Sequence, residues 1–263
     1  MVNCFARSDV MVPVAAVAEA IPMSQSVGKK AAPVFPAPIR PHTDLFSDLD
    51  AEARRWVFAL GREVILEKGD AVMTQDRICG NFYIVQSGMF AFQKCSESGL
   101  VFELGRAQAG EFFGEQFLLG DRLSEIQVVT LDRAAVRVFR ASDFRKVLNQ
   151  YPSVARRMLD AMTARLSHFA NLSFELATMK LEVRLRRILR DLALQADQLF
   201  DGGIIQPAPR HADLAAMLGT TREVISRAMM MLNRNGTITT SRKQIIIRSA
   251  RLLCFGDRTI ALE

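Results

Sequence analysis

Four polar residues near the end of the chain have the types and the spacing needed to contact DNA bases. They are Arg222, Glu223, Ser226 and Arg227, in the segment GTTREVISRAMMML (219–232). Arginine can donate two hydrogen bonds to guanine, glutamate can accept one from cytosine, and serine can bond to adenine or thymine. Positions i, i+1, i+4 and i+5 share one face of a helix, so these side chains suit a major groove.

Two short helices around a glycine turn are expected to position these side chains. Gly219 supplies the positive φ that ends the first helix, and Thr220 or Thr221 caps the second. The apolar residues at helical spacing that would pack the two helices together are Leu214, Ala215, Leu218, Ile225, Ala228, Met229 and Leu232. This arrangement predicts a helix-turn-helix.

A hairpin is expected directly after the second helix. The segment TITTSRKQIIIRS (237–249) alternates apolar and polar residues, which is typical of paired strands. Its tip would carry two cations to phosphates or to the minor groove, as a wing. The candidate DNA contacts are therefore Arg210, Thr221, Arg222, Glu223, Ser226, Arg227, Arg242 and Lys243.

A purely structural interpretation of these residues also exists. Thr220 and Glu223 have the spacing of a capping box, and Arg222 and Arg227 can be ordinary solvated charges. The distribution of charge favours the DNA interpretation. From Thr178 to Glu263 the chain has 14 lysines and arginines against 8 acidic residues, whereas the rest has 20 of each. The net charge of +6 therefore lies in the last third, as a polyanionic partner would require.

The preceding parts of the chain form three further regions. Residues 1–41 are rich in proline and alanine and are expected to be a disordered extension. Residues 42–140 contain short β-branched and aromatic runs between turn signals, which predicts a β-sandwich or barrel. Residues 141–178 are helical, with a heptad seam typical of a two-stranded coiled coil, formed by Leu159, Met162, Leu166, Phe169, Ser173 and Leu176. The alternative for that seam is a helix lying on its own barrel.

Composition argues against several other classes of protein. No apolar run is long enough to span a membrane, and we expect neither a signal peptide nor a membrane partner but a cytoplasmic protein. The four cysteines lie far apart, so a zinc site or disulfide framework is not expected. No catalytic triad, phosphate-binding glycine loop or metal-ligand spacing is present, and we predict that the protein is not an enzyme.

The motifs KGD (68–70), FYIVQSG (82–88), GEFFGE (110–115) and ADLAAMLGTTREVISR (212–227) together resemble the CRP/FNR family of bacterial transcription regulators. The resemblance runs from about Leu45 to Arg251. It implies an α+β chain with a jelly-roll barrel of the cyclic-nucleotide-binding type, a long dimerisation helix and a C-terminal winged helix-turn-helix in residues 179–263. It also implies a homodimer on palindromic double-stranded DNA with TGA-like half-sites, and RNA polymerase as a partner.

The sensing end departs from the family pattern. By resemblance the effector pocket contains Gly114, Glu115, Arg122, Ser124 and Ser173, but Leu123 stands where cyclic-AMP binders carry an arginine for the cyclic phosphate. We therefore do not expect control by cyclic AMP. An iron–sulfur cluster is not expected either, because Cys4 is the only cysteine near the N-terminus. A different small effector, a thiol switch at Cys79, or control by abundance alone remain as alternatives.

The sequence thus predicts a dimeric, sequence-specific DNA-binding regulator without a resident cofactor or metal. The alternative function is a ligand-binding regulatory module that acts without DNA.

Overall fold

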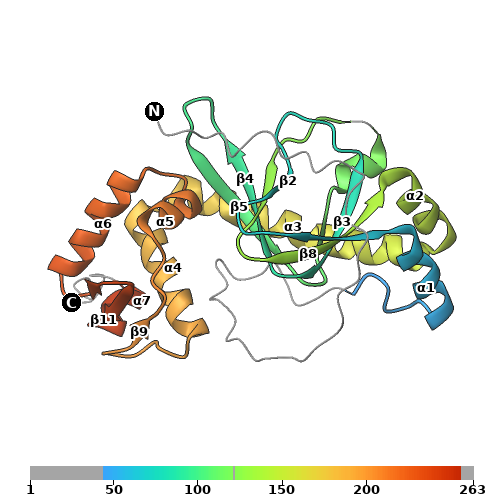
Figure 1. Cartoon of the computed structure of the whole chain (residues 1–263). Helices are drawn as coiled ribbons and strands as arrows, with labels where there is room; N and C mark the ends of the chain where they lie inside the picture. The colour runs from blue at the N-terminus through green and yellow to red at the C-terminus, as the bar shows by residue number, and fades with distance from the viewer. Residues whose placement is uncertain (1–43, 121, 256–263) are drawn as a thin grey trace.

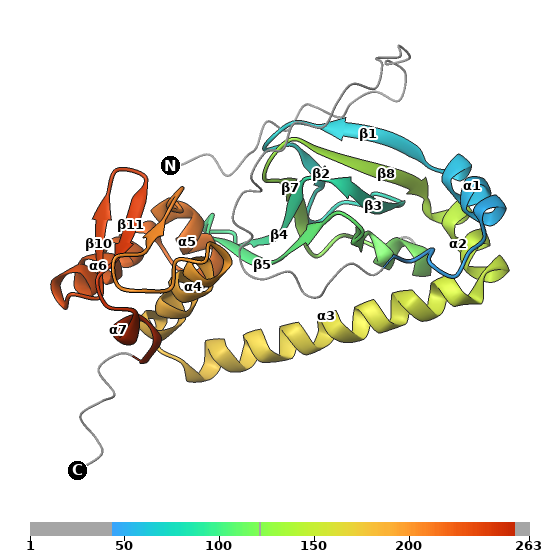
Figure 2. The ribbon, with the colours of Figure 1, turned by 90° about the horizontal axis from the view of Figure 1, so that it is seen from below.

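The computed structural model describes residues 44–120 and 122–255. The expected extension, residues 1–41, lies outside this range. An N-terminal β-barrel lies alongside one long helix, α3 (Pro152–Thr178), and a smaller C-terminal helical domain follows at the end of that helix, as Figure 2 shows. Within the described residues no helix is long and apolar enough to cross a membrane.

The barrel consists of two four-stranded antiparallel sheets, with strand orders β1-β8-β3-β6 and β2-β7-β4-β5 (Figure 1). This confirms the jelly-roll prediction. The strands are β1 (Arg62–Leu66), β2 (Ala71–Met73), β3 (Asn81–Ser87), β4 (Met89–Cys95), β5 (Val101–Gln108), β6 (Phe112–Phe113), β7 (Gln127–Thr130) and β8 (Ala134–Arg140). A 3-10 turn, η1 (Glu115–Leu119), follows β6, and helix α1 (Ala51–Leu60) precedes β1. Asp50 caps α1 by accepting a hydrogen bond from the amide of Ala53 at 2.8 Å.

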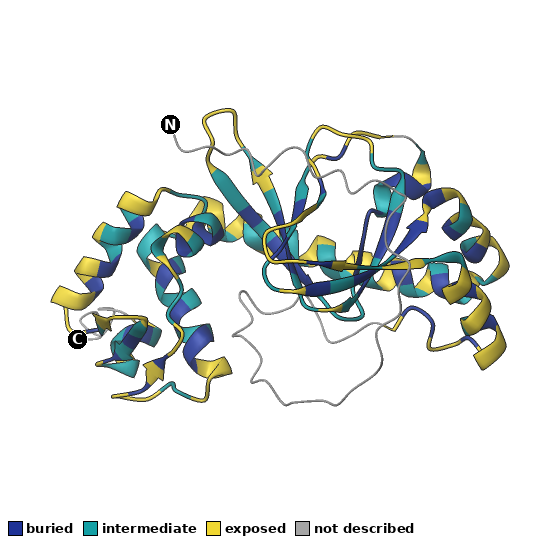
Figure 3. Cartoon of the chain, viewed as in Figure 1, coloured by how far each residue is buried: buried dark blue, intermediate teal, exposed yellow. Residues whose placement is uncertain are grey.

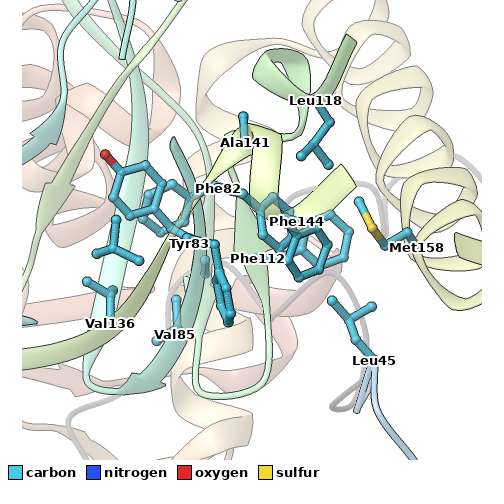
Figure 4. Close-up of a cluster of buried hydrophobic side chains, with 14 of the residues drawn as sticks. Leu45, Phe82, Tyr83, Val85, Phe112, Leu118, Val136, Ala141, Phe144 and Met158 are labelled. Carbon is cyan, nitrogen blue, oxygen red and sulfur yellow. The ribbon is translucent and has the colours of Figure 1, made fainter. Parts of the chain in front are cut away.

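Aromatic side chains from both the strands and the helices fill the core of this domain. Phe82 of β3 stacks on Phe144 of α2 (Ala141–Gln150) with ring centroids 4.0 Å apart. Figure 4 shows this stack with Met158, from the beginning of α3, lying beside it. Val154 is buried as well, so the first turns of α3 belong to the core of the barrel.

The region 141–178 contains two helices rather than one. Helix α2 ends at Gln150, and α3 begins at Pro152. The boundary has a physical reason, because proline lacks an amide hydrogen and its ring clashes with the preceding turn, whereas it is favoured at the first position of a helix.

The C-terminal domain packs helices against a three-stranded sheet of order β10-β11-β9. Its core is lined by Leu185, Leu189 and Leu192 of the first helix, together with apolar residues of the helices that follow. The elements are α4 (Leu181–Gln195), β9 (Ile204–Ile205), α5 (His211–Leu218), α6 (Arg222–Arg234), β10 (Ile238–Ser241), β11 (Gln244–Ile247) and α7 (Ala250–Phe255). The expected hairpin is β10–β11, whereas β9 was not expected from the sequence.

The two domains also touch directly, because α5 packs against β5 of the barrel, as Figure 1 shows. The ring of Phe102 lies so close to Gly219 that a Cβ atom at this glycine would be 3.1 Å from it. Beside it, Arg106 and Glu103 form a buried ion pair of 2.6 Å. Burial is the main cause that raises the pKa of Glu103, and the charge of Asp213 on α5 adds to the effect.

We expect Phe82→Ala to lower the free energy of unfolding of the barrel domain by about 3–5 kcal/mol, because it leaves a cavity in the aromatic core. The measurement is urea unfolding followed by the fluorescence of Trp56, the single tryptophan, which lies in this domain beside Tyr151. Leu119→Ala is the control, since that side chain is 76 % exposed and its loss should change stability by less than about 0.5 kcal/mol. Equal losses in the two variants would contradict the assignment of the core.

Candidate nucleic-acid interface

Helices α5 and α6 form the expected helix-turn-helix. Helix α5 ends at Leu218 and is followed by Gly219, whose φ of 64° is left-handed, a conformation that glycine adopts without steric cost. The two helices are held together by buried apolar side chains at the predicted positions, namely Leu214, Ala215, Leu218, Ile225, Met229 and Leu232. Their packing leaves the outer side of α6 exposed, as Figure 3 shows.

Thr221, rather than Thr220, caps α6. Its hydroxyl accepts a hydrogen bond from the amide of Val224 at 3.4 Å. Glu223 is therefore the second residue of the helix, and Thr220 and Glu223 do not stand in the positions of a capping box. The pKa of Glu223 is lowered, first by a hydrogen bond to its own backbone and then by one to Thr221. The carboxylate is thus held in its ionised, hydrogen-bond-accepting form at an exposed helix N-terminus.

The four candidate base contacts lie together on the N-terminal half of α6. Arg222, Glu223 and Arg227 are exposed, while Ser226 is half-buried at the edge facing α5. There the Ser226 hydroxyl lies 2.8 Å from Nδ1 of His211. The sequence analysis did not identify His211, because its relation to Ser226 depends on how two helices pack and has no local pattern.

The candidate phosphate contacts flank this helix. Arg242 and Lys243 are exposed at the tip of the β10–β11 hairpin, with Lys243 in the left-handed conformation that a tight hairpin turn demands (φ 61°). Arg210 precedes α5 and forms a surface ion pair with Asp213 at 2.9 Å. Such exposed pairs are weak, so the guanidinium can exchange this partner for a phosphate.

An apolar stripe runs along the exposed side of α3. Leu159 is 65 % exposed and Leu166 is 70 % exposed, and Met162 and Leu176 are also on the surface. Phe169 is half-buried, and Ser173 is exposed. All six belong to the predicted heptad seam. A contiguous apolar stripe of this kind typically marks a contact with another protein surface.

A second ion pair occupies the barrel side of α3. Glu115 follows Gly114, whose backbone lies so close to the carbonyl of Asn81 that no side chain fits there. Arg165 of α3 donates hydrogen bonds to Glu115 at 2.7 Å and to the carbonyl of Phe112 at 2.8 Å. Its guanidinium also lies over the ring of Phe92. The sequence analysis missed Arg165, which is an ordinary polar position in the heptad pattern.

The other residues of the predicted effector pocket do not gather around this pair. Arg122 and Leu123 are exposed, and the buried Ser124 donates its hydroxyl to the carbonyl of Ile126 at 2.6 Å. Ser173 lies eight residues beyond Arg165, which is about 12 Å further along the helix. The structure therefore brings Gly114 and Glu115 together with Arg165, but it does not bring Ser173 to them.

Cys79 lies at the edge of the barrel, where its Sγ is 2.8 Å from the hydroxyl of Tyr83. Burial is the main cause that raises the pKa of Tyr83 well above its ordinary value, and the neighbouring thiol adds to the shift. Among the described residues, no group of three histidine, cysteine or acidic side chains is arranged to hold a metal ion.

Comparison with known proteins identifies both domains. Residues 63–151 match the family model of the cyclic nucleotide-binding domain, and residues 183–254 match that of the Crp-like helix-turn-helix domain. The chain is 28 % identical over 206 residues to the probable transcriptional regulator flp of Lacticaseibacillus casei, covering 78 % of this chain and 92 % of that protein. It is 27 % identical over 209 residues to the cyclic AMP receptor protein of Thermus thermophilus, covering 80 % and 94 % of the two chains.

A solved structure shares the fold. A crystal structure of a transcriptional regulator of the crp/fnr family from Eubacterium rectale superposes with a TM-score of 0.69 at 18 % identity, over 84 % of this chain and 99 % of the other. The two domain matches and the full-length relatives agree with the geometry of the helix-turn-helix. The chain belongs to the CRP/FNR family of DNA-binding transcription regulators.

Proposed function

We propose that the chain acts as a homodimer on a palindromic DNA site, with the N-terminal half of α6 in the major groove. The observation that carries this proposal is the set of exposed groups Arg222, Glu223 and Arg227 on a helix whose other face is anchored in the core. The family's activity, regulation of transcription through DNA, requires such a surface.

Each exposed group has a counterpart on DNA. Arg222 and Arg227 can donate to guanine, and Glu223, ionised and exposed, can accept from the amino group of cytosine. Thr221 and Arg210 lie at the N-terminal ends of α6 and α5, where helices commonly meet phosphates. Arg242 and Lys243 would add phosphate contacts from the wing, without base preference. The half-site then has a TGA-like core, as the family resemblance implies.

The apolar stripe on α3 supports the homodimer. Two copies of α3 paired along this stripe would cover its leucines, which otherwise lie open to water. Pairing about a two-fold axis would present the two α6 helices to successive major grooves, about 34 Å apart. A symmetric protein and a palindromic site match for this reason.

The sensing domain supports control by a signal other than cyclic AMP. A cyclic phosphate needs a cation in the barrel, but Leu123 occupies the position that the family resemblance assigns to it, and Arg122 is exposed. Arg165 is already engaged by Glu115 and by the carbonyl of Phe112. A cyclic nucleotide would have to compete with these charge-assisted hydrogen bonds, which are among the stronger ones in proteins.

A bacterial transcription regulator binds chromosomal DNA, which lies in the cytoplasm. We therefore propose a cytoplasmic location and RNA polymerase as a partner. The surplus of basic residues in the C-terminal third, 14 against 8 acidic ones, supports attraction to nucleic acid.

Arg227→Ala should lower the affinity for a palindrome of TGA-containing half-sites relative to random DNA by about 1–3 kcal/mol per half-site, because one bidentate base contact contributes that much discrimination. Binding isotherms on both DNAs, measured at several salt concentrations, test this. The matched control is Arg242→Ala, which should weaken binding to both DNAs by the same factor and lower the salt slope. Equal losses on palindrome and random DNA for Arg227→Ala would remove its role in base recognition.

Leu166→Glu should convert the dimer to a monomer, since it places a charge in the middle of the apolar stripe. Sedimentation velocity measures the change. Asn171→Glu introduces the same charge at an exposed position on the opposite side of α3 and should leave the dimer intact. A dimer that survives Leu166→Glu would show that the chains do not pair along this stripe.

Cyclic AMP should neither bind measurably to the protein nor change its affinity for the palindrome, because the barrel lacks the phosphate-binding arginine. Titration calorimetry and DNA binding with and without the nucleotide check this. Palindrome binding that depends on cyclic AMP and disappears in Arg122→Ala would contradict the proposal and identify Arg122 as the missing cation.

A further inference from the structure

The hydroxyl of Ser226 makes an unusual hydrogen bond for a serine in a helix. Serine and threonine side chains within helices commonly donate to the carbonyl one turn earlier. Three hydroxyls of α3 do so: Thr163 bonds to Leu159, Ser167 to Thr163, and Thr178 to Phe174. In α6, by contrast, the Ser226 hydroxyl lies 2.8 Å from Nδ1 of His211, a side chain of the neighbouring helix.

The histidine is held in place by the packing of the two helices. His211 is the first residue of α5, and the ring is half-buried. Leu214, one turn later on α5, and Ile225, next to Ser226 on α6, are both fully buried. The distance from the ring to the hydroxyl is therefore fixed by the same core that fixes α6.

A fixed imidazole neighbour changes what a serine can offer to a base. A free hydroxyl can donate one hydrogen bond or accept two, so it bonds to any base edge. The 2.8 Å contact fits either direction of the hydrogen bond, and the direction depends on the tautomer of His211. In the tautomer that carries its proton on Nε2, Nδ1 accepts the hydroxyl hydrogen, and the remaining lone pairs of Oγ can only accept. Serine then favours bases with an exocyclic amino group, adenine or cytosine, over the acceptor groups of guanine and thymine.

We propose that His211 is a positioning residue that fixes the hydroxyl of Ser226 as a hydrogen-bond acceptor and thereby sets the base preference at one half-site position. This inference rests on the proposed placement of α6 in the major groove. It adds a specificity-determining residue that itself lies outside the base-contacting face.

The test compares the affinities of the full-length dimer for a panel of palindromes in which each half-site position carries each of the four bases. The wild-type protein should prefer adenine or cytosine at one position. His211→Phe retains a ring without a nitrogen, and Ser226→Ala removes the hydroxyl. Each should reduce this preference by about 3- to 10-fold, the value of one neutral hydrogen bond. The double variant should be no worse than either single variant, because both remove the same interaction.

Two further variants separate positioning from packing. His211→Asn places an amide oxygen near the position of Nδ1 and should restore part of the preference. Ser167→Ala removes a hydroxyl bonded to the backbone of α3 and should change no base preference. Ser167→Ala should also leave the affinity for random DNA and the midpoint of thermal unfolding unchanged.

The inference is overturned if His211→Phe keeps the wild-type preferences, or weakens binding to every sequence by the same factor. It is also overturned if the two single effects add, or if the wild-type preference at that position is for guanine or thymine. Failure of the proposed function has a different signature, since the wild-type protein would then not distinguish any palindrome from random DNA.

Discussion

The arrangement of the molecule depends on the burial of the first turns of α3 in the aromatic core of the barrel. Val154 and Met158 are as much part of that core as the phenylalanines of the strands. This anchor fixes the rotation of the helix about its axis. The same rotation directs Arg165 toward Glu115 and leaves Leu159 and Leu166 on the surface. The barrel contact and the apolar stripe are consequently two faces of one rigid element.

Some arginines of the C-terminal domain form ion pairs with carboxylates of the chain, and others are exposed to solvent. Three arginines of α4 pair with carboxylates: Arg186 with Glu182, Arg187 with Glu175 near the end of α3, and Arg190 with Asp191. Arg184 instead donates a hydrogen bond to the carbonyl of Leu218. The arginines of α6 and of the wing, Arg222, Arg227 and Arg242, are exposed. These exposed positive charges are available to a polyanion, whereas the Arg187–Glu175 pair links α4 to the long helix.

Local patterns in the sequence were sufficient for the main elements. Short β-branched and aromatic runs between turn signals predicted the barrel strands, and alternation predicted the wing. The helical period predicted α5, α6 and the stripe on α3. Gly219 marked the turn because few other residues adopt its conformation.

Features that depend on tertiary packing were not predictable. Arg165 and His211 acquire their roles from groups 50 and 15 residues away in the chain, and neither has a local signature. Ser173 is exposed on α3, about 12 Å along the helix from Arg165, and its assignment to the effector pocket stays a prediction.

Gly219 satisfies two requirements that have different origins. Its positive φ is needed for the turn between α5 and α6, while the ring of Phe102 leaves little room for a side chain at the same point. A substitution at Gly219 would therefore disturb both the turn between α5 and α6 and the contact of this turn with the barrel. In a chimaera that joined this helix-turn-helix to another sensing domain, the surface at Gly219 would have no aromatic ring to pack against it. Transferring the β4–β5 hairpin together with the DNA-binding domain would preserve the contact between Phe102 and Gly219, so the two segments should be transferred together.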